Sequence, residues 1–238
     1  MTSIDDRMKE LEHSTRSYLP RRSYTMIRLD GKCFHSFTRR AKKPFDPVLI
    51  AAMSQTTKYL CENIQGCKIG YTQSDEISLV LADFDSIKSE PWMKGNLQKI
   101  VSISASMATA FFNTYDFPFT NSLAIFDSRA WTISDPWEVY NTFLWRQQDC
   151  TKNSIQMVAR SHYSHKELMN KKYADLHEMI YKKGDNFDSY PTHCKRGTFV
   201  VKENGNWVID QNAPILTQDK NYFFSRLPLI PQPDMSAA

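Results

Sequence analysis

The sequence lacks the residue spacings that hold a metal through cysteine and histidine. Its five cysteines include no CxxC pair, and His162 and His165 form a close histidine pair that no cysteine or second histidine pair completes. Structural zinc sites and disulfide frameworks both depend on such spacings. We therefore expect no structural zinc and free thiols in a reducing compartment, which favours a cytoplasmic protein.

Long apolar runs are also absent. Residues 100–112 form one of the longest apolar stretches, but serine and threonine interrupt it and it is too short for a membrane span. Residues 1–22 are charged and lack an apolar core, so we expect a short helix there rather than a secretory signal. Hydrophobic residues make up 41% of the chain and charged residues 24%, which is ordinary for a globular protein. We expect one domain over residues 1–238, with a core at about 24–203.

The net charge is small, +4, but the basic residues are unevenly distributed. They form two groups: Arg21, Arg22, Arg39, Arg40, Lys42 and Lys43, and then Lys166, Lys171, Lys172, Lys182, Lys183, Lys195 and Arg196. Most charge runs are solvated surface. Two basic groups in a weakly charged protein also suit a polyanion, either nucleotide phosphates or an RNA backbone.

Periodicity and capping signals predict the order of the structural elements. The expected strands are 24–29, 67–71, 77–81, 122–131 and 197–203, and the expected helices are 47–63, 97–112 and 137–161. Asp46 and Asp135 each precede a proline, which is the pattern of a helix N-cap. The first six elements follow the β-α-β-β-α-β order of a ferredoxin-type fold, so we expect an α/β (α+β) domain with added helices.

Acidic residues stand where this fold would bring two chain segments together. Asp30 ends the first strand and Gly31 follows it, while Asp75 and Glu76 lie at the tip of the predicted hairpin. Neighbouring carboxylates raise each other's pKa unless a cation neutralises them, and Mg²⁺ binds such oxygen ligands while phosphates and water complete its shell. Alone, Asp30-Gly31 is equally typical of a turn after a strand. With the hairpin acids, it predicts a magnesium site for phosphoryl transfer, with the Gly31 carbonyl as a possible ligand.

Five motifs in order resemble one known family. They are "RLDGKCFHSF", "KKPFD", "YTQSDEISLV", "WRQQDC" and "KRGT", and the resemblance spans roughly residues 24–203. The family is that of the histidine-tRNA guanylyltransferases, 3′-5′ polymerases that add nucleotides to the 5′ end of tRNA. The resemblance implies a polymerase-palm-like fold, which agrees with the order of elements. It also implies catalysis by in-line displacement at phosphorus after activation of the RNA 5′ phosphate by a triphosphate.

The resemblance further implies which residues form the site. Asp30, Asp75 and Glu76 are the expected catalytic residues, and two Mg²⁺ ions are expected on Asp30, Asp75 and the Gly31 carbonyl. The implied nucleotide-binding residues are Asp30, Gly31, Lys32, Cys33, Phe34, His35, Lys43, Asp46, Ser74, Asp75, Asn153, Lys195 and Arg196. The implied substrates are GTP, ATP and other nucleoside triphosphates, with the acceptor-stem 5′ end of tRNA. A homo-dimer or tetramer is expected, and no membrane partner.

The segment after Cys150 departs from the strict histidine-tRNA enzymes. Those enzymes continue His-Ile-Asn-Asn-Leu-Tyr-Asn, whereas residues 151–157 read TKNSIQM and keep only Asn153. This resembles the guanylyltransferase-like branch, which repairs 5′-truncated tRNA using the opposite strand as template. Untemplated guanylate addition to histidine tRNA is one alternative. A palm-fold nucleotidyl cyclase and a non-catalytic RNA-binding module are two others, although the intact acids argue against the last.

Overall fold

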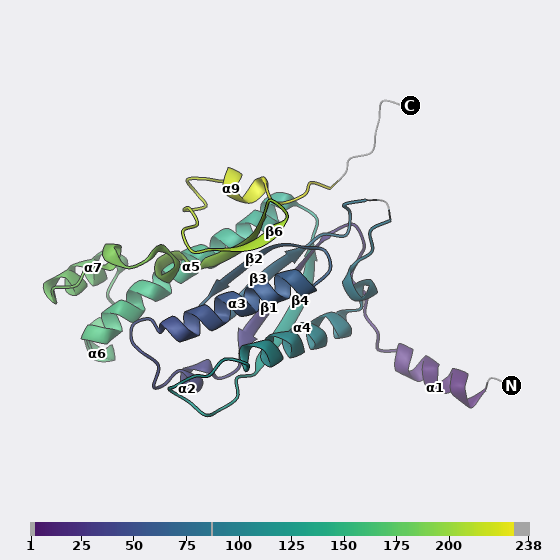
Figure 1. The fold of residues 1–238 in the computed structure, drawn as a ribbon, viewed down its shortest axis with the longest axis horizontal. Coiled ribbons are helices and arrows are strands. Elements are labelled where there is room, and N and C mark those ends of the chain that lie inside the picture. The colour runs from purple at the N-terminus through teal and green to yellow at the C-terminus, as the bar shows by residue number, and fades with distance from the viewer. Residues whose placement is uncertain (1–2, 87, 231–238) are drawn as a thin grey trace.

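A six-stranded antiparallel sheet forms the centre of the computed structural model, which describes residues 3–86 and 88–230 (Figure 1). Its strands lie in the order β4-β1-β3-β2-β5-β6. They are β1 (Tyr24–Gly31), β2 (Cys67–Gln73), β3 (Glu76–Leu81), β4 (Phe126–Ile133), β5 (Thr198–Glu203) and β6 (Asn206–Asp210). The first four strands and the helices between them follow the predicted β-α-β-β-α-β order, which confirms the ferredoxin-type core.

The predicted helices form, and shorter ones join them. The helices are α1 (Ile4–His13), α2 (Phe34–Phe37), α3 (Pro47–Asn63), α4 (Leu97–Phe112), α5 (Pro136–His162), α6 (His165–Leu168), α7 (Tyr173–Lys182), α8 (Thr192–Arg196) and α9 (Asn221–Phe224), with 3-10 turns η1 (Trp92–Gly95) and η2 (Phe187–Ser189). The Asp46 carboxylate accepts the Val48 and Leu49 N–H groups, and Asp135 accepts that of Trp137. Both predicted N-caps are therefore confirmed.

Different helices pack against the two faces of the sheet. Alternate side chains of β1, including Ile27 and Leu29, pack under α3 and α4, while Tyr24 and Met26 pack under α5. Figure 1 shows α3 and α4 together on one face of the sheet, with α6 and α7 gathered at one end of the molecule. Because α5 is long, it crosses its face of the sheet and continues into a separate small core with α6 and α7.

At the other end of the molecule, α1 projects away from the body, and none of its residues is buried (Figure 1). The expected N-terminal helix therefore forms, held by a capping box from Ser3 to Asp6. Within the described ranges, no helix combines the length and apolarity needed to cross a membrane.

Two strand predictions need correction. The fourth strand starts at Phe126 rather than at residue 122, because the Asn113 side chain pairs with both the N–H and the C=O of Ala124, each at 2.9 Å. Strand β6 was missed altogether. The signal was present, since Asn204 and Gly205 both adopt positive φ between β5 and β6, as an Asn-Gly hairpin turn requires.

Candidate active site

The end of β1 meets the turn of the β2–β3 hairpin. Asp30 lies directly opposite Glu76 in the β1–β3 register, and the Gly31 N–H donates to the Asp75 carbonyl at 3.1 Å. Ser74 and Asp75 form the turn itself, with Ser74 at φ +50°. The fold therefore gathers the three predicted acids at one end of the sheet.

The Asp75 carboxyl lies in an environment that shifts its pKa. Burial raises the pKa of the Asp75 carboxyl, a hydrogen bond from Ser74 partly offsets this, and the nearby Asp30 and Glu76 carboxylates raise the pKa further. Within residues 3–86 and 88–230, neither Asp30 nor Asp75 takes part in an ion pair. Two carboxylates without a protein cation are a donor set that fits Mg²⁺, which keeps phosphate oxygens and water as its other ligands.

Glu76 has a different environment. Its Oε2 accepts Arg146 Nη1 at 2.9 Å, and its Oε1 lies 3.3 Å from Arg28 Nε, with all three side chains largely buried. Ser78 also donates to Oε1 at 3.3 Å. Both carboxylate oxygens are therefore engaged, and the charge of Glu76 is already compensated within the protein.

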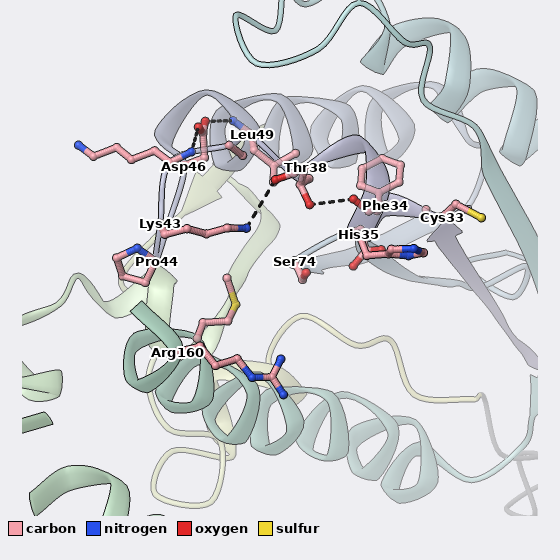
Figure 2. Close-up of a pocket in the computed structure, with 15 residues that line it drawn as sticks. Cys33, Phe34, His35, Thr38, Lys43, Pro44, Asp46, Leu49, Ser74 and Arg160 are labelled. Carbon is pink, nitrogen blue, oxygen red and sulfur yellow. Dashed lines mark hydrogen bonds between the residues drawn. The ribbon is translucent and has the colours of Figure 1, made fainter. Parts of the chain in front are cut away.

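A cavity of about 500 Å³ opens beside Asp75, between the segment after β1 and the later part of α5. It is lined by Gly31, Cys33, Phe34, His35, Thr38, Ala41, Lys42, Lys43, Pro44, Asp46, Leu49, Ser74, Asp75, Met157 and Arg160. Figure 2 shows Lys43 entering it from one wall and Arg160 reaching in from α5, with Ser74 and His35 farther along. The lining includes three basic residues, Lys42, Lys43 and Arg160, and a cavity with such cations near paired acids suits a triphosphate beside a metal.

Packing explains why residue 31, at the edge of this cavity, has no side chain. A Cβ on Gly31 would collide with the Phe34 ring. That ring is buried among Phe37, Phe112 and Phe126, with centroids 5.0–5.6 Å away. A glycine at position 31 therefore lets the aromatic core pack directly under the site. This packing is a second reason for a glycine here, in addition to the close backbone approach expected from the sequence.

The 42–47 loop takes its shape from one carboxylate. Asp46 Oδ2 accepts the Lys42 N–H at 2.8 Å, while Oδ1 caps α3. Asp46 therefore fixes the conformation of the loop that carries Lys43. Among the residues that the structure describes, the Lys43 ammonium makes one long hydrogen bond, 3.5 Å to the Thr38 carbonyl, so it is available for a phosphate (Figure 2).

Four of the predicted residues lie apart from this cavity. Lys32 is exposed and contributes its N–H to the Ile125 carbonyl, and Asn153 is exposed with its amide on Asp149. Lys195 and Arg196 line a second cavity of about 630 Å³, together with Lys152 and Tyr173. Asp30 and Glu76 adjoin the first cavity without lining it.

Several lining residues were missed from sequence, and Arg160 is the most informative of them. It lies seven residues after Asn153 on α5, and Met157 lies four after it. Residues at i, i+4 and i+7 share a helix face, so helical spacing from Asn153 was the signal that pointed to both. The remaining missed residues are Thr38, Ala41, Lys42, Pro44 and Leu49.

Comparisons with known proteins agree with the motifs. The family model "Thg1: tRNAHis guanylyltransferase" matches residues 5–134, more than half of the 238 residues. A bacterial tRNA(His) guanylyltransferase (Thg1)-like protein, solved in complex with ATP, is 42% identical with a TM-score of 0.90, over 95% of this chain and 100% of that one. Such a protein in complex with GTP is 40% identical with a TM-score of 0.79, over 92% and 97% of the chains.

A curated relative extends the comparison to a eukaryote. The tRNA(His) guanylyltransferase of Schizosaccharomyces pombe is 28% identical over 200 residues, which cover 76% of this chain and 74% of that protein. The predicted palm-like fold is confirmed by the bacterial structures. The chain therefore belongs to the tRNAHis guanylyltransferase family, and it is a nucleotidyltransferase.

Proposed function

We propose that this protein adds nucleotides in the 3′-5′ direction to the 5′ end of truncated tRNA, using the opposite strand as template. The observation that carries the proposal is the contrast in identity, 42% with a bacterial Thg1-like protein against 28% with the fission-yeast tRNA(His) guanylyltransferase. The departure at residues 151–157 from the histidine-specific motif supports the same branch. Untemplated guanylate addition to histidine tRNA is the competing function.

The proposed site divides its work among three sets of residues. Asp30, Asp75 and the Gly31 carbonyl would hold Mg²⁺, which supplies charge neutralisation and a more acidic attacking hydroxyl when bound. Lys43 and Arg160 hold the triphosphate of the incoming nucleotide in the cavity beside Asp75. Glu76 keeps Arg28 and Arg146 in place next to the carboxylates.

The reaction is a pair of displacements at phosphorus. The RNA 5′ phosphate first attacks the α-phosphorus of an activating triphosphate, and pyrophosphate leaves. The 3′-hydroxyl of the incoming nucleotide then attacks the activated 5′ phosphate, loses its proton and displaces the activating nucleoside monophosphate. Two triphosphates are therefore needed, and we assign the activating one to the second cavity, where Lys152, Lys195 and Arg196 lie. In both displacements the protein contributes mainly positioning and charge.

The Lys43→Ala variant should raise the KM of all four nucleoside triphosphates by a similar factor, about tenfold. The ammonium faces the cavity with one weak protein contact, and contacts to phosphate position a substrate without reading its base. Steady-state kinetics with each nucleotide would measure this. Lys58→Ala is the matched control, because Lys58 lies on α3 outside the cavity. A loss confined to one nucleotide would overturn the assignment to phosphate.

The proposed function is tested by extension of a 5′-truncated tRNA with each nucleotide supplied separately, together with ATP for activation. We expect the nucleotide complementary to the opposing base to be added in a Mg²⁺-dependent reaction that releases pyrophosphate. Cyclic product from a triphosphate alone would instead indicate a cyclase. RNA binding without pyrophosphate release would indicate a binding module.

We further propose one catalytic domain, a cytoplasmic location and a homo-oligomer, either dimer or tetramer. The five free cysteines are consistent with the proposed compartment. The assembly is supported by α1, where Ile4, Met8 and Leu11 are 43–74% exposed on one helix face.

A further inference from the structure

An exposed tryptophan stands next to the acidic site without a part in the chemistry above. Trp145 belongs to α5 and to the "WRQQDC" motif, and it is 56% exposed. The guanidinium carbon of Arg146 lies 3.7 Å from the centre of its indole, and that of Arg28 lies 5.1 Å away. An indole stacked on cations while largely open to solvent is an arrangement that can receive a second flat group.

The support under this indole is rigid. Glu76 binds both Arg28 and Arg146, and Arg146 also contacts Asp149 at 3.3 Å. Arg28 lies in addition 5.5 Å from the ring of Trp131 on β4. In the described part of the chain, Arg28 Nη2 and Arg146 Nε are buried without hydrogen-bond partners. The ion pairs therefore fix both guanidinium groups against the indole, although not every guanidinium nitrogen is hydrogen-bonded.

The position of Trp145 relates it to the substrates. Arg28 precedes Asp30 by two residues on the same face of β1, a distance of about 7 Å. Met157 lies twelve residues beyond Trp145 on α5, or about 18 Å along the helix, at the nucleotide cavity. Along β1 and α5 the order is therefore the same: Trp145 comes first, then the carboxylates, and then the nucleotide cavity. A group on Trp145 would lie on the far side of the carboxylates from the incoming nucleotide.

We propose that Trp145 is a stacking platform for an unpaired base of the RNA strand opposite the 5′ end. The inference rests on the proposed function, because it requires an RNA end at the carboxylates. An enzyme that copies a template must hold that strand without reading it, and base–aromatic stacking tolerates any base. Unpaired RNA bases are held in this way on aromatic rings and arginine planes. Arg129, exposed and directly opposite Arg28 in the β1–β4 register, is placed to contact the backbone phosphate of the same strand.

The test compares two RNA hairpins with the same acceptor stem, one with a single-stranded 3′ extension and one blunt. Affinities are measured by fluorescence anisotropy without nucleotides, for the wild type and for Trp145→Ala. We expect the variant to bind the extended RNA about tenfold more weakly and the blunt RNA unchanged. Trp145→Phe should recover most of the affinity, because a ring remains. Trp137→Ala is the matched control: Trp137 is 50% exposed on the same helix but packs on Phe224, so both affinities should stay unchanged.

Other outcomes would overturn the platform. Equal losses for both RNAs, or no loss for either, would show that Trp145 does not recognise an unpaired base. Unchanged RNA affinity with a raised KM for ATP would assign the indole to the activating nucleotide. If Trp145→Ala fails to fold, Trp145→Leu covers the arginines without a ring and serves in its place. The binding measurement needs no catalysis, so it tests the stacking platform independently of the reaction. Untemplated addition by the wild type would refute the proposed function but would not change the outcome of the binding measurement.

Discussion

Asp30→Ala and Asp75→Ala should each reduce nucleotide addition at least about a hundredfold while leaving the fold intact. The two carboxylates meet where Gly31 bonds the Asp75 carbonyl, and they lack ion-pair partners in the part of the chain that the structure describes. Removing one preorganised group at a site of developing charge typically costs ~10²–10³ in rate. Single-turnover addition to a truncated tRNA measures the loss, and circular dichroism checks the fold.

Asp85→Ala is the control for these variants. Asp85 is also a carboxylate near the β3 strand, but it pairs with Lys68 outside the cavity, so its removal should leave the rate unchanged. If Asp30→Ala or Asp75→Ala kept more than a few per cent of the wild-type rate with a native spectrum, the metal assignment would be wrong. Isothermal titration calorimetry with Mg²⁺ alone gives a second readout. The heat of Mg²⁺ binding should disappear in Asp30→Ala and Asp75→Ala and remain in Asp85→Ala.

Glu76→Ala should lower the free energy of unfolding by about 3–5 kcal/mol, the typical cost of breaking a buried ion pair. The substitution removes the ion-pair partner of Arg28 and leaves Arg146 only its contact with Asp149, while 11% and 9% of the two arginine side chains are exposed. Burial already lowers the pKa of the Arg28 guanidinium, and Glu76 is the group that opposes this effect most. Urea denaturation with a shared m-value would measure the change.

The comparison for Glu76 is an exposed ion pair on α3. Glu62 lies 3.8 Å from Lys58 with both side chains substantially exposed, so Glu62→Ala should change stability by no more than about 0.5 kcal/mol. A loss below about 1 kcal/mol for Glu76→Ala would mean that the arginines find other partners. Such a result would contradict the structural role of Glu76 and leave the catalytic role that the family resemblance implies.

Local signals predicted the parts of the fold and site that short segments determine. Asp46-Pro47 and Asp135-Pro136 start helices because a cap and a fixed φ act within one turn. The hairpin tip follows from the two short β-prone runs on either side of a polar segment. The meeting of Asp30 with Asp75 also followed, because the β-α-β-β-α-β order leaves few arrangements of its strands.

Contacts between distant segments could not be predicted in the same way. Arg160 reaches a cavity built mostly from residues 31–49, and Arg146 pairs with Glu76 seventy positions earlier. Helical spacing from Asn153 indicates the helix face of Arg160, but nothing in the sequence near either arginine identifies the distant segment that it contacts, because that contact depends on how α5 crosses the sheet. The same holds for Arg196: its motif predicts a nucleotide contact, but only the packing of α8 reveals that Arg196 lines a second cavity.

The most direct measurement of the central claim uses two 5′-truncated tRNAs that differ only at the base opposite the missing nucleotide. Each is offered all four nucleoside triphosphates in competition, and the added 5′ nucleotide is identified by sequencing. A mispaired nucleotide displaces its 3′-hydroxyl from the attacking position, and even ~1 Å of misplacement can cost ~100-fold in rate. We therefore predict that each tRNA receives the complement of its own templating base. Guanylate added to both tRNAs, whatever the opposing base, would contradict templated repair and make this protein a histidine-type guanylyltransferase.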